Sequence, residues 1–360
     1  MTCAAIRRLS LSVSRHCGAQ RLFRLWSKGP TVLFYHGVEE TLLDPDVQGL
    51  HLPLRVFEQQ IAFLRRHREV VSMDYLYECI VNGYGLESGH VILTFDDGYK
   101  NNLHIVAPLL KAWKLPFTIF VSTRHISECV RFPAYYIRVA ILYTEKEAVY
   151  LRSINKGFDL TTREKRLAAA RTIIQIAKRA PLDLVEHIRT ECIRQLTSDK
   201  WAELNARFSS DEPMSWDDVI QATSMGATIG SHCHDHCILH SNQQEEEVHR
   251  QLTKSKAAIE ANIMDCKYMA YPNGTLEDIS SIAYAAVKSA QFRMAFSTIL
   301  GEVTSDGDCF LAPRISAETE YEEFCYLLNR TSRQNEIYKT ARLQLLHRVK
   351  ELRLERAQIV

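Results

Sequence analysis

From residue 31 to about residue 330, short apolar runs alternate with amphipathic stretches of helical length. The runs are rich in β-branched and aromatic residues and almost continuous in apolar character, which is typical of strands covered on both faces. Seven strands joined by helical crossovers predict an α/β fold with a parallel sheet, either closed as a barrel or doubly wound. The predicted strands are Val32–His36, Val91–Phe95, Phe117–Val121, Ala227–Ser231, Lys267–Tyr271, Phe292–Ser297 and Phe310–Ile315.

Residues 124–213 interrupt this alternation. They contain helical patterns, notably Arg163–Arg179 and, after the helix breaker Pro181, Leu182–Leu196, but no clear strand. We therefore expect a helical insertion between two strands, which would serve as a lid or a docking surface.

The two ends of the chain differ from its middle. Residues 1–30 carry six Lys or Arg and no acidic residue, interleaved with apolar residues. This basic arm could be poorly ordered or form a surface helix, contact an anionic membrane surface, or act as a transit peptide. Residues 331–360 are expected to form a charged helix, and the domain between the ends, residues 31–330, would include the insertion. The apolar residues through which the charged helix is expected to pack are Leu343, Leu346, Val349 and Leu352.

Charge and composition exclude several classes of protein. Of the 360 residues, 44 are Lys or Arg and 43 are Asp or Glu, so we expect no nucleic-acid partner. Ten scattered cysteines favour free thiols in a reducing compartment. No run has the length and apolar character of a membrane span or a secretory signal. We therefore expect a cytoplasmic protein, with the basic arm as a potential peripheral contact with an anionic membrane.

The first group of chemically functional residues is Thr94-Phe95-Asp96-Asp97-Gly98-Tyr99, directly after an apolar run. Adjacent residues in mid-strand point to opposite faces, but two neighbouring carboxylates can share a site where the chain turns at a strand's carboxyl end. Gly98 permits that turn, and the active sites of parallel α/β folds lie at that end. The alternative is a plain turn with one aspartate capping the next helix.

The second group is Gly230–Cys237, again just past an apolar run. His232 and His236 are four residues apart, and on a helical turn this spacing puts both imidazoles on one face, within reach of one metal ion. His236 and His240 have the same spacing, and a chance cluster on an exposed loop is the alternative to either pair. The spacing of Cys233 and Cys237 does not fit a zinc knuckle, which favours packing over ligation for the two cysteines.

An acid at one strand end and a histidine pair at another give the two-His-one-carboxylate set typical of open catalytic metal sites. Three protein ligands leave room for water, and a second carboxylate can act as the base in hydrolysis. Zinc fits such a set, and Co²⁺, Ni²⁺ and Mn²⁺ are the alternatives.

These motifs resemble those of the polysaccharide deacetylases with a NodB homology domain, also called carbohydrate esterase family 4. The family's first motif, Thr-Phe-Asp-Asp-Gly, is unbroken at Thr94–Gly98, and its second, His-(Ser/Thr)-x-x-His, corresponds to His232–His236 with a cysteine in the small-residue position. The resemblance covers roughly residues 31–330. Its supporting features, in family order, are Val32–His36, Phe57–Leu64, Met269–Gly274 and Ala312–Ile315.

The resemblance implies a distorted (β/α) barrel of the NodB type with a helical insertion. It implies that Asp96 is the general base and that a divalent metal is held by Asp97, His232 and His236. The backbone N–H of Asn273 is then expected to face the oxyanion. Further expected contacts with the substrate or the oxyanion are Tyr99, Tyr271 and Pro272.

The chain departs from the family pattern in two places. Ala270 occupies the position where the third motif often has an arginine that orients the base, and the later Asp-x-x-Asp-Trp and Leu-x-His motifs have no match. Arg314 could orient Asp96 instead, or serve ordinary pairing or packing. His36 is the candidate general acid or substrate contact, with a core histidine as the alternative.

The sequence therefore predicts metal-dependent hydrolytic N-deacetylation of an N-acetylated sugar, in a glycan or a lipid-linked polysaccharide precursor. The alternative is a non-catalytic carbohydrate-binding or scaffolding protein that keeps the barrel. A glycosidase with Asp96 and Asp97 as acid and base is disfavoured, because such carboxylates normally lie ~5–10 Å apart across the scissile bond.

Overall fold

The computed structural model describes residues 29–83, 85–317, 320–328, 340–349 and 351. The predicted basic arm lies almost wholly outside the described residues, so its membrane contact stays a prediction. No helix in the described part of the chain has the length and apolar character needed to cross a membrane.

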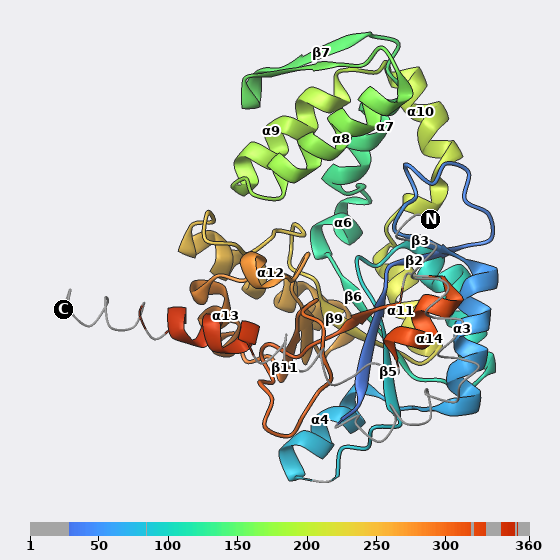
Figure 1. Ribbon diagram of the computed structural model, residues 1–360, viewed down its shortest axis with the longest axis vertical. Coiled ribbons are helices and arrows are strands. Elements are labelled where there is room, and N and C mark those ends of the chain that lie inside the picture. Colours follow the sequence, from blue (N-terminus) through green and yellow to red (C-terminus); the bar gives the residue numbers. More distant parts are fainter. Residues whose placement is uncertain (1–28, 84, 318–319, 329–339, 350, 352–360) are drawn as a thin grey trace, which may run out of the picture.

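One curled parallel sheet forms the centre of the protein (Figure 1). Its strand order is β11-β10-β9-β6-β5-β1-β12, and β4 pairs with the start of β5. Both faces of the central strands are covered, because every residue of β5 and β6 is buried. The predicted distorted barrel is thereby confirmed. The strands are β1 (Thr31–Tyr35), β4 (Glu69–Val70), β5 (His90–Phe95), β6 (Phe117–Val121), β9 (Ala227–Ser231), β10 (Tyr268–Ala270), β11 (Met294–Phe296) and β12 (Ile315–Ser316).

The last predicted strand, Phe310–Ile315, is wrong in its bounds, because β12 begins only at Ile315. Pro313 has no N–H to donate to a ladder. The segment before it instead bonds to the other edge of the sheet, where Ala312 N–H donates to the carbonyl of Ala295 and Ser297 N–H to the carbonyl of Ala312, each at 2.9 Å. Since Ile315 pairs with β1, this segment links the two edges of the curled sheet.

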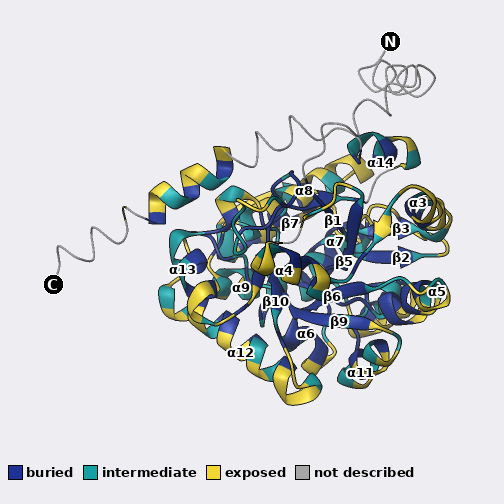
Figure 2. Cartoon of the chain, turned by 90° about the horizontal axis from the view of Figure 1, so that it is seen from below, coloured by how far each residue is buried: buried dark blue, intermediate teal, exposed yellow. Residues whose placement is uncertain are grey.

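Helices surround the strands, with their exposed residues facing outward (Figure 2). The apolar face of α3 is buried at Phe57, Ile61 and Leu64. Two further strands, β2 (Gly37–Glu39) and β3 (His51–Pro53), pair with each other. The surrounding helices are α3 (Leu54–His67), α4 (Met73–Asn82), η2 (Asn102–Val106), α5 (Ala107–Ala112), α11 (Trp216–Ser224), α12 (Glu245–Ile263), η5 (Leu276–Asp278), α13 (Ser281–Ser289) and α14 (Tyr321–Leu327).

The expected insertion stands on one end of the barrel (Figure 1) and has its own buried core. The expectation that it contains no strand is wrong, because β7 and β8 form an antiparallel hairpin. Val149 and Leu151 of β7 are buried and alternate with exposed neighbours, a pattern too short to separate from the helical segments around it. The elements of the insertion are α6 (Thr123–Glu128), α7 (Pro133–Tyr143), β7 (Ala148–Leu151), η3 (Arg152–Ile154), β8 (Lys156–Asp159), α8 (Arg163–Ala177), α9 (Leu182–Ile193), α10 (Ser198–Arg207) and η4 (Ser209–Asp211).

Residues 340–349 are helical, as expected, and of the expected packing residues Val349 and Leu346 contact the core, whereas Leu343 does not. Ala341, Leu345 and Val349 are buried against the barrel core, whereas Leu343 is 68% exposed. The buried positions are spaced four apart, and Leu343 lies on the opposite side of that helix. Leu346 is partly buried against the core, and Leu352 lies outside the described residues.

Candidate active site

Asp96 and Asp97 lie where β5 ends and the chain turns. Asp96 N–H still donates to the carbonyl of Tyr35 at 2.8 Å, as in the ladder, but Asp97 and Gly98 both take left-handed backbone angles, with φ of 75° and 78°. A Cβ on Gly98 would lie 2.9 Å from a methyl of Val121, so a larger residue would strain the turn. The turn presents both carboxylates, each almost fully buried, at the carboxyl end of the sheet.

His232 and His236 follow β9 in a loop, so the expected helical turn is absent. The loop curls back because Cys233 and His236 have left-handed φ values of 63° and 52°. Such angles cost free energy in residues other than glycine and cluster at functional sites. They place His236 Nε2 3.1 Å and His232 Nε2 3.5 Å from Asp97 Oδ1.

The residues Asp97, His232 and His236 fit a divalent metal ion. Their ligand atoms lie within 4.8 Å of one another. The two measured ligand separations are close to the edge of about 3.3 Å that a tetrahedral zinc site with ~2.0 Å bonds would have. Asp97 Oδ1 is buried and accepts no hydrogen bond from the described residues, so a lone pair is available to a cation.

The protonation of the ligands also suits a metal. His232 Nδ1–H donates to the carbonyl of Ala270 at 2.8 Å, which leaves Nε2 with a free lone pair toward Asp97. Burial, opposed by the charge of Asp96, lowers the pKa of His232 to about 4, so this ring is neutral at pH 7. Burial would raise the pKa of Asp97, but His236 and the neighbouring histidines hold it well below its usual value.

The rival ligands in the same loop are placed elsewhere. His240 is buried, and its Nδ1 accepts the backbone N–H of Asn242 at 3.2 Å, outside the three-residue cluster. Cys233 and Cys237 pack in the barrel core, where burial raises the pKa of both thiols. Both cysteines therefore pack in the core, and neither belongs to the three-residue cluster, although Cys237 also borders the cavity described below.

Arg314 reaches Asp96 from the last strand segment. Its Nη1 and Nη2 donate to the two oxygens of Asp96, each at 2.7 Å, and its Nε donates to the carbonyl of Ser297 at 3.0 Å. The guanidinium is fully buried over the ring of Phe34. Burial would raise the pKa of Asp96, but the charges of Arg314 and His232 hold it below its usual value. Asp96 is thus an oriented carboxylate beside the three potential ligands.

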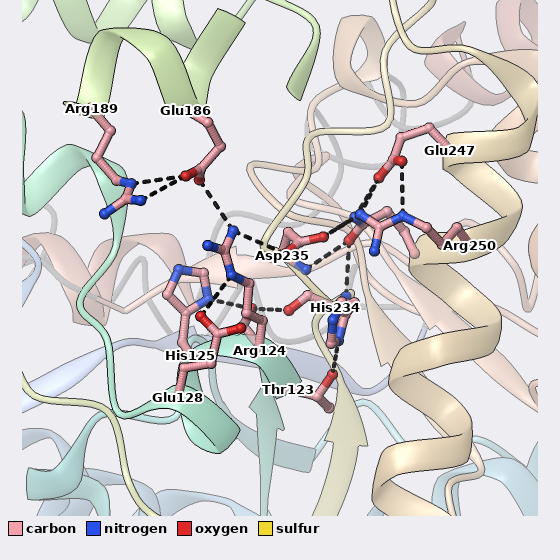
Figure 3. Close-up of polar contacts among 12 residues, drawn as sticks. Thr123, Arg124, His125, Glu128, Glu186, Arg189, His234, Asp235, Glu247 and Arg250 are labelled. Atoms are coloured by element: carbon pink, nitrogen blue, oxygen red, sulfur yellow. Dashed lines mark hydrogen bonds and ion pairs between the residues drawn. The ribbon is translucent and has the colours of Figure 1, made fainter. Parts of the chain in front are cut away.

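A polar network fixes the histidine loop from outside. The backbone N–H groups of His234 and Asp235 both donate to Gln251 Oε1, at 3.0 and 2.8 Å, and Gln251 Nε2 donates to Asp235 at 2.6 Å. Arg250 and Arg124 pair with the same aspartate, and Arg124 also pairs with Glu186 of α9 (Figure 3). The loop is therefore attached both to α12 and to the insertion.

Replacing Gln251 by leucine is expected to destabilise the fold by about 2–4 kcal/mol, because it leaves two backbone N–H groups without their acceptor. Urea unfolding monitored by circular dichroism measures this. Gln221→Leu, on the exposed side of α11, is the matched control and should change the free energy of unfolding by less than about 0.5 kcal/mol. Equal midpoints for the two variants would show that Gln251 does not support the loop.

A cavity of about 640 Å³ opens onto the three potential ligands, between the end of the barrel and the insertion. His36, Tyr99 and Asn273 line it, as does Asp96. Burial and the nearby charge of Asp97 raise the pKa of Tyr99 well above its usual value, so its hydroxyl remains a donor. Asn273 has a left-handed φ of 60°, and its Oδ1 accepts from Lys178 at 2.7 Å.

Two of the expected substrate contacts do not line the cavity. Tyr271 points into the barrel core, where its hydroxyl donates to the carbonyl of Phe310 at 2.9 Å. Pro272 is buried and outside the lining. Successive side chains of a strand point to opposite faces, so the sequence does not show which residues of β10, or directly after it, face the cavity. Of Tyr271, Pro272 and Asn273, only Asn273, at the turn, lines it.

Three cations of the insertion also line the cavity, and none of them was predicted as a site residue from the sequence. They are Arg138 on α7, Arg171 on α8, and Lys178, which ends α8. The spacing of Arg171 and Lys178 predicts that they share one face of a helix. No signal in the sequence indicates that this face turns toward the barrel.

Comparisons with known proteins agree with this geometry. The family model described as Polysaccharide deacetylase matches residues 84–295. Among solved structures, the chain resembles the Streptococcus pyogenes deacetylase PplD in complex with acetate, with 13% identity and a TM-score of 0.53, over 84% of this chain and 96% of that one. It also resembles IcaB from Ammonifex degensii, with 15% identity and a TM-score of 0.53, over 84% of this chain and 98% of that one. These structural likenesses concern the fold. No curated protein is similar enough in sequence to match the chain.

Proposed function

Since this chain belongs to the polysaccharide deacetylase family and is a carbohydrate N-deacetylase, we propose that it removes the acetyl group from an N-acetylated sugar by metal-dependent hydrolysis in the cavity described above. The observation that carries this proposal is the Asp96–Arg314 pair beside the cluster of Asp97, His232 and His236. An oriented carboxylate next to a three-residue ligand set is what hydrolysis at an open metal site requires.

Asp97, His232 and His236 would hold the divalent ion, which, when bound, polarises the acetamide carbonyl and lowers the pKa of water. Asp96, kept ionised by Arg314, accepts the proton of the attacking water. The backbone N–H of Asn273 donates to the developing oxyanion. His36, which lines the cavity beside Asp96, is the proposed donor of the proton to the leaving amine.

Arg314 acts in this scheme by positioning Asp96 and keeping its carboxyl group ionised. Without the guanidinium, burial becomes the main influence on the pKa of Asp96, so Arg314→Met should raise that pKa. Because the base works as a carboxylate, the acidic limb of the kcat/KM profile should move to higher pH. Arg314→Lys keeps the charge and should shift the limb less. A limb that stays in place in both variants would assign Arg314 to packing alone.

The proposed function is tested by acetate release from N-acetylated oligosaccharides and glycosides. The metal-loaded protein should release one acetate for each free amine formed, lose activity after chelation, and regain it when zinc is returned. Absence of acetate from every sugar at full metal content would instead support a non-catalytic carbohydrate-binding protein.

A further inference from the structure

The insertion lines its side of the cavity with side chains that deacetylation does not use. Leu167, Ala170 and Ile174 of α8 are apolar lining residues, and Arg171 and Lys178 line the cavity from the same helix or its end. These positions are three and four residues apart, so they lie on one face of α8, which borders the cavity from Leu167 onward. Ala170 and Ile174 on this face also pack in the core of the insertion.

The three cations of this wall form no ion pair with an acidic side chain of the described residues. Arg138 donates to the carbonyl of Val47 at 3.4 Å, and Lys178 to Asn273 Oδ1 at 2.7 Å, both uncharged acceptors. Arg171 is exposed at the cavity wall and forms no ion pair with the part of the chain that the structure describes. Burial lowers the pKa of Lys178, the charge of Asp278 opposes this, and the charge of Arg138 lowers it further, which places Lys178 and Arg138 within electrostatic reach of each other. Asp278 itself pairs with Arg179.

The acidic residues around the cavity already have partners of their own. Asp96 pairs with Arg314, and Asp97 lies with the two histidines. The remaining pairs are Asp46 with Arg163, Asp211 with His51, and Asp235 with Arg124 and Arg250. The wall formed by the insertion is therefore cationic, and a neutral sugar bound against it would leave these charges partly desolvated without a counter-charge.

We propose that the substrate carries its N-acetylated sugar on a phosphate diester attached to an apolar chain. The phosphate binds Arg138, Arg171 and Lys178, since guanidinium groups match phosphate oxygens in charge and geometry. The apolar chain lies along the face of α8 formed by Leu167, Ala170 and Ile174, where sugar hydroxyls would lack partners. This inference rests on the proposed deacetylase function and specifies its substrate class.

Four synthetic derivatives of N-acetylglucosamine separate the contributions: the methyl glycoside, the octyl glycoside, the methyl phosphodiester and the octyl phosphodiester. The zinc-loaded full chain should deacetylate the octyl phosphodiester with a kcat/KM about 100-fold above that of the methyl glycoside, with each of the two groups contributing. UDP-N-acetylglucosamine, which has phosphate but no apolar chain, should not exceed the methyl phosphodiester.

The variants Arg171→Gln and Arg138→Gln should each lower the preference for phosphodiester over glycoside about 10-fold. Arg194→Gln, on the same insertion but outside the cavity lining, should leave that preference unchanged. Thermal unfolding of each variant shows whether the fold is kept, and the within-variant ratio does not depend on the folded fraction.

Equal kcat/KM for all four derivatives would overturn the inference while the release of acetate still supported the proposed function. A preference for the nucleotide sugar would show that no apolar chain of the substrate binds along the face of α8, and would overturn that part of the inference. Absence of acetate from every derivative at full metal content would overturn the proposed function, and this inference with it.

Discussion

Asp96→Asn should lower kcat/KM for acetate release by about 10³-fold while the protein keeps one metal ion per chain. The amide keeps the shape of the side chain but cannot accept the proton of the attacking water. Asp96 is not one of the three potential ligands, so the metal content should not change. Acetate release is measured on metal-loaded protein, with metal content determined by mass spectrometry on the same sample.

The buried Arg314 loses its charged partner in this variant, so some loss of stability is also expected. Rates are therefore compared per folded, metal-loaded chain, with circular dichroism as the check on folding. A fall in activity that merely follows a fall in metal content would remove Asp96 from the role of base and make it a contributor to the metal site.

Asp97→Asn and His232→Ala should both lose the metal ion, and with it essentially all activity. Each removes one of only three protein ligands, and an open three-ligand site has no spare donor among the described residues. Metal content after dialysis against a weak chelator measures this, and we expect less than about a tenth of an ion per chain in either variant.

His240→Ala is the matched control, because His240 is a buried histidine of the same loop that lies outside the cluster. It should keep one ion per chain. Retention of metal by His232→Ala together with its loss in His240→Ala would show that His236 and His240 form the true histidine pair.

The positions of the ligands could be predicted because they follow from local rules. Asp96–Gly98 and His232–His236 each follow a strongly apolar strand, and the carboxyl ends of parallel strands meet at one end of the sheet. The strand order therefore brings Asp97 and both imidazoles to the same end of the sheet. The left-handed turns at Asp97 and His236 that complete the approach were not visible in the sequence.

Other features depend on long-range packing and could not be fixed from the sequence. Arg314 was a candidate partner for Asp96, but their meeting depends on how the segment before β12 links the two edges of the sheet. Tyr271 was expected beside the substrate, and the direction of its side chain was decided by the core around Phe310. The direction in which the cationic face of α8 points could not be predicted either. A helix with apolar residues on two sides has two surfaces to bury, and the sequence does not show which one faces the barrel.

The central claim is that two distant stretches of the chain hold one cation beside Asp96. Anomalous X-ray diffraction at the zinc edge, from crystals of the zinc-loaded protein, tests it most directly. We predict a single anomalous peak per chain, within about 2.3 Å of Asp97 Oδ1 and of the Nε2 atoms of His232 and His236, with Asp96 still paired to Arg314. A peak bound by other residues, or no peak at this cluster in fully loaded crystals, would contradict it.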